Sequence, residues 1–83
     1  MEYNSQDRKE ARDHTTAFIG VVSNRSKGDV VISIQELYTH VGAKNISQKN
    51  GVQWSIRDLK DKGIVSRVYD IYGKKVKGIY TIK

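Results

Sequence analysis

Residues 33–65 read SIQELYTHVGAKNISQKNGVQWSIRDLKDKGIV, and this stretch contains the two helices that decide the fold. Ser33 and Glu36 have the spacing of a capping box, in which each side chain satisfies a free backbone N–H at a helix start. Apolar residues follow at helical spacing, at Ile34, Leu37, Tyr38 and Val41. Gly42 then supplies a left-handed stop. The pattern predicts a short helix between this cap and this stop.

A second helix follows, and its end is clearer than its start. Gly63 closes it, and its buried face carries Val52, Ile56 and Leu59. Ser47 and Asn50 could both cap its first turn, and Gly51 weakens a helix that already runs through it. We expect the earlier start, after Ser47, with Ile46 as an apolar plug in the preceding turn.

The first part of the chain predicts one long helix. It starts at about Ser5, the expected N-cap, and its apolar stripe contains Ala11, His14, Thr15, Phe18, Val21 and Val22. Residues 23–29 have loop chemistry and close this helix. The β-branched residues 30–32 suit a short strand. Residues 1–4 are expected to form a flexible N-terminus.

Residues 64–83 alternate like two strands of a hairpin. With Gly73 and Lys74 as a two-residue turn, a continuous register pairs Val65 with Ile82. One face then collects apolar side chains that could cover the helices, namely Val65, Tyr69, Ile71, Val76, Tyr80 and Ile82. The expected tip is cationic and carries Lys74, Lys75 and Lys77.

The composition bounds the class of protein. The 83 residues are enough for one domain, and the absence of cysteine excludes disulfides and thiolate metal sites. No apolar run reaches the roughly 20 residues that cross a bilayer, and no secretory leader opens the chain. These features predict a cytoplasmic, nucleoid-associated protein, or a nuclear one if the source is eukaryotic.

The charge is divided unevenly along the chain. Residues 44–83 carry ten cations and three anions, a balance of +7, whereas residues 1–43 carry five cations and six anions, a balance of −1. Such a skew on a short chain is typical of a surface that faces a polyanion.

The element order α, β, α, α, β, β resembles the winged-helix branch of the helix-turn-helix superfamily. The residues that carry the resemblance are Ser33-Ile34-x-x-Leu37, Gly42, Val52-x3-Ile56-x2-Leu59-x3-Gly63-Ile64-Val65 and the hairpin after them. The resemblance covers almost the whole chain. It implies a small α+β fold in which residues 5–83 form a single domain with a three-helix core and a C-terminal β-hairpin wing. The stretch between Val41 and Val52 is several residues longer than the tight turn of bacterial repressors, which leaves the pose of the third helix open.

The resemblance also implies how DNA would be bound, with the third helix (about residues 48–62) in the major groove and the hairpin on the backbone. A helical wheel independently places polar residues opposite the buried stripe. Because Asn and Gln pair with adenine and Arg with guanine, we expect base contacts from Asn50, Gln53, Trp54 and Arg57. Backbone contacts are expected from Lys44, Ser47, Gln48, Lys49, Lys60, Arg67, Lys74, Lys75 and Lys77.

Each of these residues also has an interpretation without DNA. Polar side chains on an outer helix face are common in any soluble domain. Asp58 and Asp61 are expected to pair with Arg57 and Lys62 at helical spacing. Trp54 is open between a DNA contact, a protein partner and burial in the core.

The function that the sequence favours is that of a double-stranded DNA-binding protein, a small transcriptional regulator. Helix 1 is the expected surface for homodimer formation, with Ala17 and Ile19 beside its buried stripe. The alternative is a winged-helix protein-interaction module that acts on a transcription or replication complex through Trp54. Binding of single-stranded nucleic acid would need more aromatic residues on the basic face than Trp54 and Tyr72.

No motif supports enzyme chemistry. The sequence shows no phosphate-binding glycine loop and no nucleophile paired with a base, so we expect neither catalytic residues nor a cofactor. His14 and His40 lack a third ligand at metal spacing, and no metal site is expected.

Overall fold

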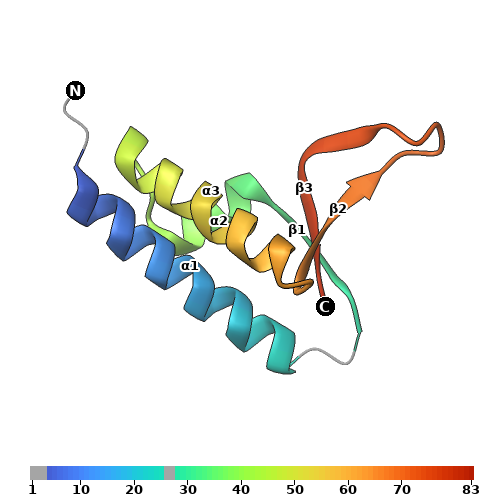
Figure 1. Ribbon diagram of the computed structural model, residues 1–83, viewed down its shortest axis with the longest axis horizontal. Helices are drawn as coiled ribbons and strands as arrows, with labels where there is room; N and C mark the ends of the chain where they lie inside the picture. The colour runs from blue at the N-terminus through green and yellow to red at the C-terminus, as the bar shows by residue number, and fades with distance from the viewer. Residues whose placement is uncertain (1–3, 26–27) are drawn as a thin grey trace.

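The computed structural model describes residues 4–25 and 28–83, which fold as a small α+β structure (Figure 1). Its elements are α1 (Ser5–Arg25), β1 (Val30–Ser33), α2 (Ile34–Val41), α3 (Ile46–Asp61), β2 (Val65–Tyr69) and β3 (Lys75–Ile82). This order confirms the α, β, α, α, β, β prediction. Three residues of the expected flexible N-terminus, 1–3, lie outside the described residues.

The three strands form one antiparallel sheet in the order β1-β3-β2. β3 lies in the middle, so Ile82 pairs with Val30 of β1 on one side and with Val65 of β2 on the other. The core lies where Ile32, Val65 and Ile82 of the sheet pack against the helices. Its largest fully buried apolar side chains are Ile19, Leu37, Val52, Val65 and Ile82.

α2 forms as the sequence predicts. The Ser33 hydroxyl accepts the Glu36 N–H at 3.1 Å, and the Glu36 carboxylate accepts the Ser33 N–H at 3.3 Å, which completes the capping box. Gly42 ends the helix at φ +74°, in the left-handed region. Leu37 is buried, and the other expected apolar residues are partly buried against the core: Ile34, Tyr38 and Val41.

α3 begins before either expected start. Asn45 is its N-cap and forms a reciprocal capping box with Gln48, so the prediction of a start after Ser47 or Asn50 was wrong. Ile46 is exposed and does not plug the preceding turn. The other end agrees with the sequence, since Gly63 follows the last turn at φ +80°. The predicted buried face is also confirmed at Val52, Ile56 and Leu59.

The predicted stripe of α1 is confirmed at Ala11 and Thr15, which are buried, and at Phe18 and Val22, which pack against the core. It was wrong at His14 and Val21, which are exposed, and it missed Ile19, which is buried. Because Ile19 is fully buried, it cannot serve the expected self-association surface. The N-cap is Asn4, whose side-chain oxygen accepts the N–H groups of Gln6 and Asp7, and this corrects the assignment to Ser5.

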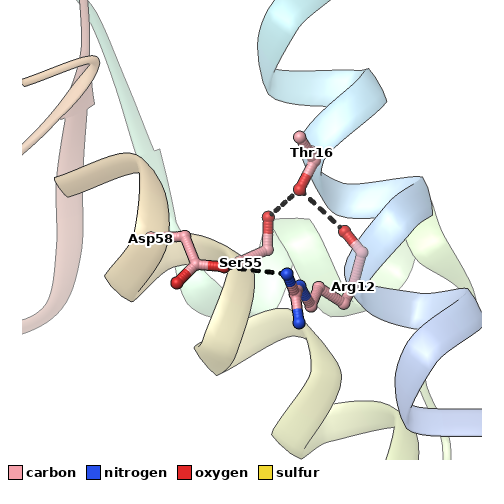
Figure 2. A network of polar contacts seen from close by, with 4 residues as sticks. All are labelled: Arg12, Thr16, Ser55 and Asp58. Carbon is pink, nitrogen blue, oxygen red and sulfur yellow. Dashed lines mark hydrogen bonds and ion pairs between the residues drawn. The ribbon is translucent and has the colours of Figure 1, made fainter. Parts of the chain in front are cut away.

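α1 and α3 approach each other closely at Gly51. A Cβ on Gly51 would lie 2.2 Å from the Arg8 carbonyl oxygen and 2.9 Å from the Ala11 Cβ, so only glycine fits at this crossing. Further along, the hydroxyls of Thr16 and Ser55 are hydrogen-bonded at 2.6 Å (Figure 2). Small and polar residues therefore hold the two helices together where large apolar side chains would keep them apart.

An ion pair completes this contact between α1 and α3. The Arg12 guanidinium lies 3.4 Å from the Asp58 carboxylate (Figure 2). Both side chains are about half exposed, so the pair contributes little stability by itself. It does correct the expectation that Asp58 pairs with Arg57 or Lys62 along its own helix.

The hairpin follows the predicted register only near the core. Val65 pairs with Ile82 and Arg67 with Tyr80, but Tyr69 then pairs with Lys75 where a continuous register would give Gly78. β3 therefore carries a bulge, and Gly78 adopts φ +77° within it. Figure 1 shows β3 bending as the hairpin extends beyond the helices.

The turn of the hairpin is built on Asp70. Its carboxylate accepts the N–H groups of Tyr72 and Lys74, each at 2.9 Å, and its carbonyl oxygen accepts the Gly73 N–H at 3.0 Å. The predicted two-residue turn at Gly73 and Lys74 was wrong, because the aspartate side chain stabilises a longer loop. The predicted apolar face is broken as a result, and its exposed members are Tyr69, Ile71 and Val76.

Candidate nucleic-acid interface

α3 presents a polar face to solvent, as the helical wheel predicts. Gln53 and Arg57 are exposed, and Asn50 is half-buried. The close crossing at Gly51 and the buried residues Val52, Ile56 and Leu59 fix this orientation, because they hold the rest of the helix surface against α1 and the core. All four expected base-contacting residues are therefore at least partly accessible, with Asn50, Gln53 and Arg57 on this face and Trp54 at its edge next to α1.

A groove lies between this helix and the base of the hairpin. It is lined by Ile34, Tyr38, Gln53, Ile56, Arg57, Lys60, Arg67, Lys77, Gly78 and Tyr80. Four of these residues are cations, two from α3 and two from the hairpin, and none of the described residues lining it is acidic. The groove therefore brings positive charge from two separate parts of the sequence to one concave surface, which we call the basic groove.

Tyr38 stands at the α2 side of the basic groove and organises two of the expected contacts. Its hydroxyl accepts a hydrogen bond from the Gln53 side-chain amide at 3.0 Å. The Lys49 ammonium lies 5.6 Å from the centre of its ring, within reach of a cation–π interaction. Tyr38 also lines a shallow hollow next to the groove together with Lys44 and Lys49.

Tyr38 and Tyr80 were not predicted to take part in binding, because their helical and strand spacing indicated core residues. Both are partly buried and line the basic groove. Their hydroxyl groups could have indicated a position at the edge of the core, since a partly buried tyrosine hydroxyl needs a polar partner.

Lys74 and Lys75 lie further out, at the exposed end of the hairpin. With Lys77 they continue the positive charge from the basic groove towards the turn. All three side chains are solvent-accessible, as phosphate contacts require.

Two expected backbone contacts are not supported by the structure. Ser47 is only 1% exposed, and its hydroxyl accepts the Asn4 N–H at 2.7 Å. Gln48 uses its side-chain oxygen to accept the N–H groups of Lys44 and Asn45. Because α3 starts at Ile46 and both side chains are engaged within the protein, neither residue is available for a phosphate contact.

Trp54 lies at the other edge of α3, away from the basic groove. It is 46% exposed, so it is neither a core residue nor fully solvated. The Arg8 guanidinium lies 5.4 Å from the centre of its ring. Its other neighbours come from α1, and together they line a small hollow with Ser5, Gln6, Lys9, Arg12 and Asp13.

Residues 4–25 and 28–83 contain no group of three or more metal-ligating side chains. His40 instead stacks on Phe18 with ring centroids 4.6 Å apart. No helix in this part of the chain is long and apolar enough to cross a membrane.

No protein-family model, curated protein or solved structure matches this chain.

Proposed function

We propose that the chain is a winged-helix protein that binds double-stranded DNA and acts as a small transcriptional regulator. In this proposal α3 enters the major groove, and the β2–β3 hairpin is the wing that contacts the phosphate backbone. The three helices, the antiparallel sheet and their order along the chain are compatible with that fold.

The observation that carries the proposal is the basic groove. Arg57 and Lys60 of α3 face the same hollow as Arg67 and Lys77 of the hairpin. One duplex could therefore touch the helix and the wing together, which is the geometric requirement of this binding mode. A concave cationic surface without acidic lining residues also raises the local concentration of a polyanion.

The residues divide into two roles. Arg57, Asn50 and the free edge of the Gln53 amide would read base edges. The cations around them would contact phosphates, which gives affinity and orientation without sequence information. That second set consists of Lys44, Lys49, Lys60, Arg67, Lys74, Lys75 and Lys77.

A binding selection on random duplexes, repeated at two salt concentrations, tests the proposal. An enriched sequence motif supports base readout by α3. The double variant Lys60→Glu/Arg67→Glu should lose binding, whereas Lys9→Glu, an exposed position on α1, should change affinity much less. The absence of any complex at low salt, or an equal loss in both variants, would contradict the proposal.

Trp54 supports a second candidate function, that of a protein-interaction module in a transcription or replication complex. A half-exposed tryptophan in a hollow is typical of an interface anchor, and this hollow lies on the α1 side of α3. This alternative would be favoured if the Trp54→Ala variant still binds duplex DNA but no longer binds a purified polymerase or replication subunit.

Self-association through α1 remains a prediction. Since Ile19 is buried, a dimer would have to use the exposed residues Ala17 and Val21, which line a shallow groove with His14, Phe18, His40 and Val41. Sedimentation velocity with Val21→Asp would test it, and a monomeric wild-type chain at high concentration would exclude it.

A further inference from the structure

The hairpin tip, residues 69–77, presents large apolar side chains to solvent. Ile71 is 91% exposed and Tyr72 is 81% exposed. Tyr69 and Val76 are also exposed beside them. Large apolar residues that cluster on a protruding element mark an interaction surface more often than scattered single residues do.

The tip is held in one shape. The Asp70 carboxylate binds two backbone N–H groups of the loop, and the Asp70 N–H donates to the Lys74 carbonyl oxygen at 2.8 Å. Gly73 takes φ +79°, which a β-branched residue would resist. Ile71 and Tyr72 therefore project from a preorganised turn, which lowers the entropy cost of inserting them into a partner.

The charges around these side chains indicate what the partner is. Lys74, Lys75 and Lys77 belong to the tip, and its one acidic residue, Asp70, has its carboxylate engaged by the turn. Lys77 also lines the basic groove, so the apolar tip continues directly from the surface proposed to hold DNA. An apolar point flanked by cations complements a nucleic acid, whose stacked bases lie between rows of phosphates.

We propose that the hairpin tip is a wedge that enters the minor groove and bends the duplex. Ile71 and Tyr72 would press against a base step and partly unstack it, while the three lysines contact the flanking phosphates. This inference rests on the proposed function, because it assumes that a duplex occupies the basic groove. It adds that the protein deforms DNA as well as binding it.

Fluorescence resonance energy transfer between labels at the two ends of a duplex of about 30 base pairs measures the bend. The wild-type chain at saturation should bring the two end labels closer together. The variant Ile71→Ser/Tyr72→Ser should leave the saturated duplex straight and lose less than about tenfold in affinity, because removing the wedge also removes the cost of unstacking. Both positions are exposed, so thermal unfolding should match that of the wild type.

The variant Lys74→Ser/Lys75→Ser is the matched control. It should weaken binding and reduce the log–log salt slope by about two, yet still bend the duplex once saturation is reached. Two results would overturn the wedge and leave the proposed function intact. One is a straight duplex in the saturated wild-type complex, and the other is an unchanged bend with the Ile71→Ser/Tyr72→Ser variant. No complex at low salt would overturn both.

Two other occupants of the tip would be recognised by their own measurements. Competition in which anionic phosphatidylserine vesicles displace the duplex from the wild-type chain, but not from the Ile71→Ser/Tyr72→Ser variant, would point to a lipid surface. A dimer in sedimentation that this variant abolishes would point to a second copy of the chain. Either result would overturn the wedge.

Discussion

A single missing side chain, at Gly51, sets how closely α1 and α3 pack. We predict that Gly51→Ala destabilises the fold by about 1–3 kcal/mol, because overpacking forces rigid backbone to move. The cause is the Arg8 carbonyl oxygen, 2.2 Å from the position of the new Cβ. Urea unfolding measures the effect.

Gly20→Ala is the matched control for this substitution. Gly20 also lies in a helix, α1, but its Cβ would meet nothing within 4 Å. Alanine there should leave stability unchanged or raise it by about 0.5–1 kcal/mol through helix propensity. Equal unfolding midpoints for the two alanine variants would contradict the close-packing interpretation.

Arg57 and Lys75 should respond differently to truncation if they have different roles. Arg57→Ala should cost about 1–3 kcal/mol of binding free energy on the selected sequence and relax the preference at one base position. Lys75→Ala should weaken binding to all sequences by a similar factor. Titration of the selected duplex and a scrambled duplex measures both, and parallel losses on the two duplexes from both variants would exclude a base-reading role for Arg57.

The bulge in β3 sets the course of the hairpin. Gly78 adopts φ +77°, and a Cβ there would lie 3.4 Å from the Ile34 Cγ2 atom. Gly78→Ala should therefore destabilise the chain by about 1–2 kcal/mol, the cost of a left-handed backbone for an L-residue. Because Gly78 lines the basic groove, DNA affinity should fall as well. Thermal unfolding and duplex titration measure the two effects, and unchanged values in both would contradict this role for the bulge.

Elements whose ends depend on local side-chain chemistry could be predicted from the sequence. The Ser33–Glu36 capping box and the glycine stops at Gly42 and Gly63 involve residues only a few positions apart. The start of α3 was missed because Asn45 and Gln48 form an equivalent box that the apolar spacing did not reveal. The hairpin turn was missed because the Asp70 carboxylate binds the N–H groups of Tyr72 and Lys74 and so stabilises a longer loop than Gly73 alone indicates.

The positive charge of the whole molecule should make binding strongly dependent on salt. Seven lysine and arginine side chains remain in the proposed phosphate-contacting set, and each contact contributes about −0.9 to the log–log slope on duplex DNA. With all seven in contact with phosphates, we predict a slope of about −6. Fluorescence anisotropy at a series of salt concentrations measures it, and a slope near zero would exclude phosphate binding as the source of affinity.

The site as a whole could be predicted only in part. The exposed face of α3 follows from its helical period, so Gln53 and Arg57 were placed correctly on the accessible side. The basic groove could not be predicted, because it depends on the bulge that bends β3 and on the position of Tyr38 beside α3. The engagement of Ser47 was missed for a related reason, since the N–H group that its hydroxyl accepts belongs to Asn4, which is far away in the sequence.

The position of Trp54 has a practical consequence, because it is the chain's single indole fluorophore. Its emission should shift when α1 separates from α3, since Arg8 and the hollow along α1 shield it. An unlabelled sample could therefore report helix separation optically.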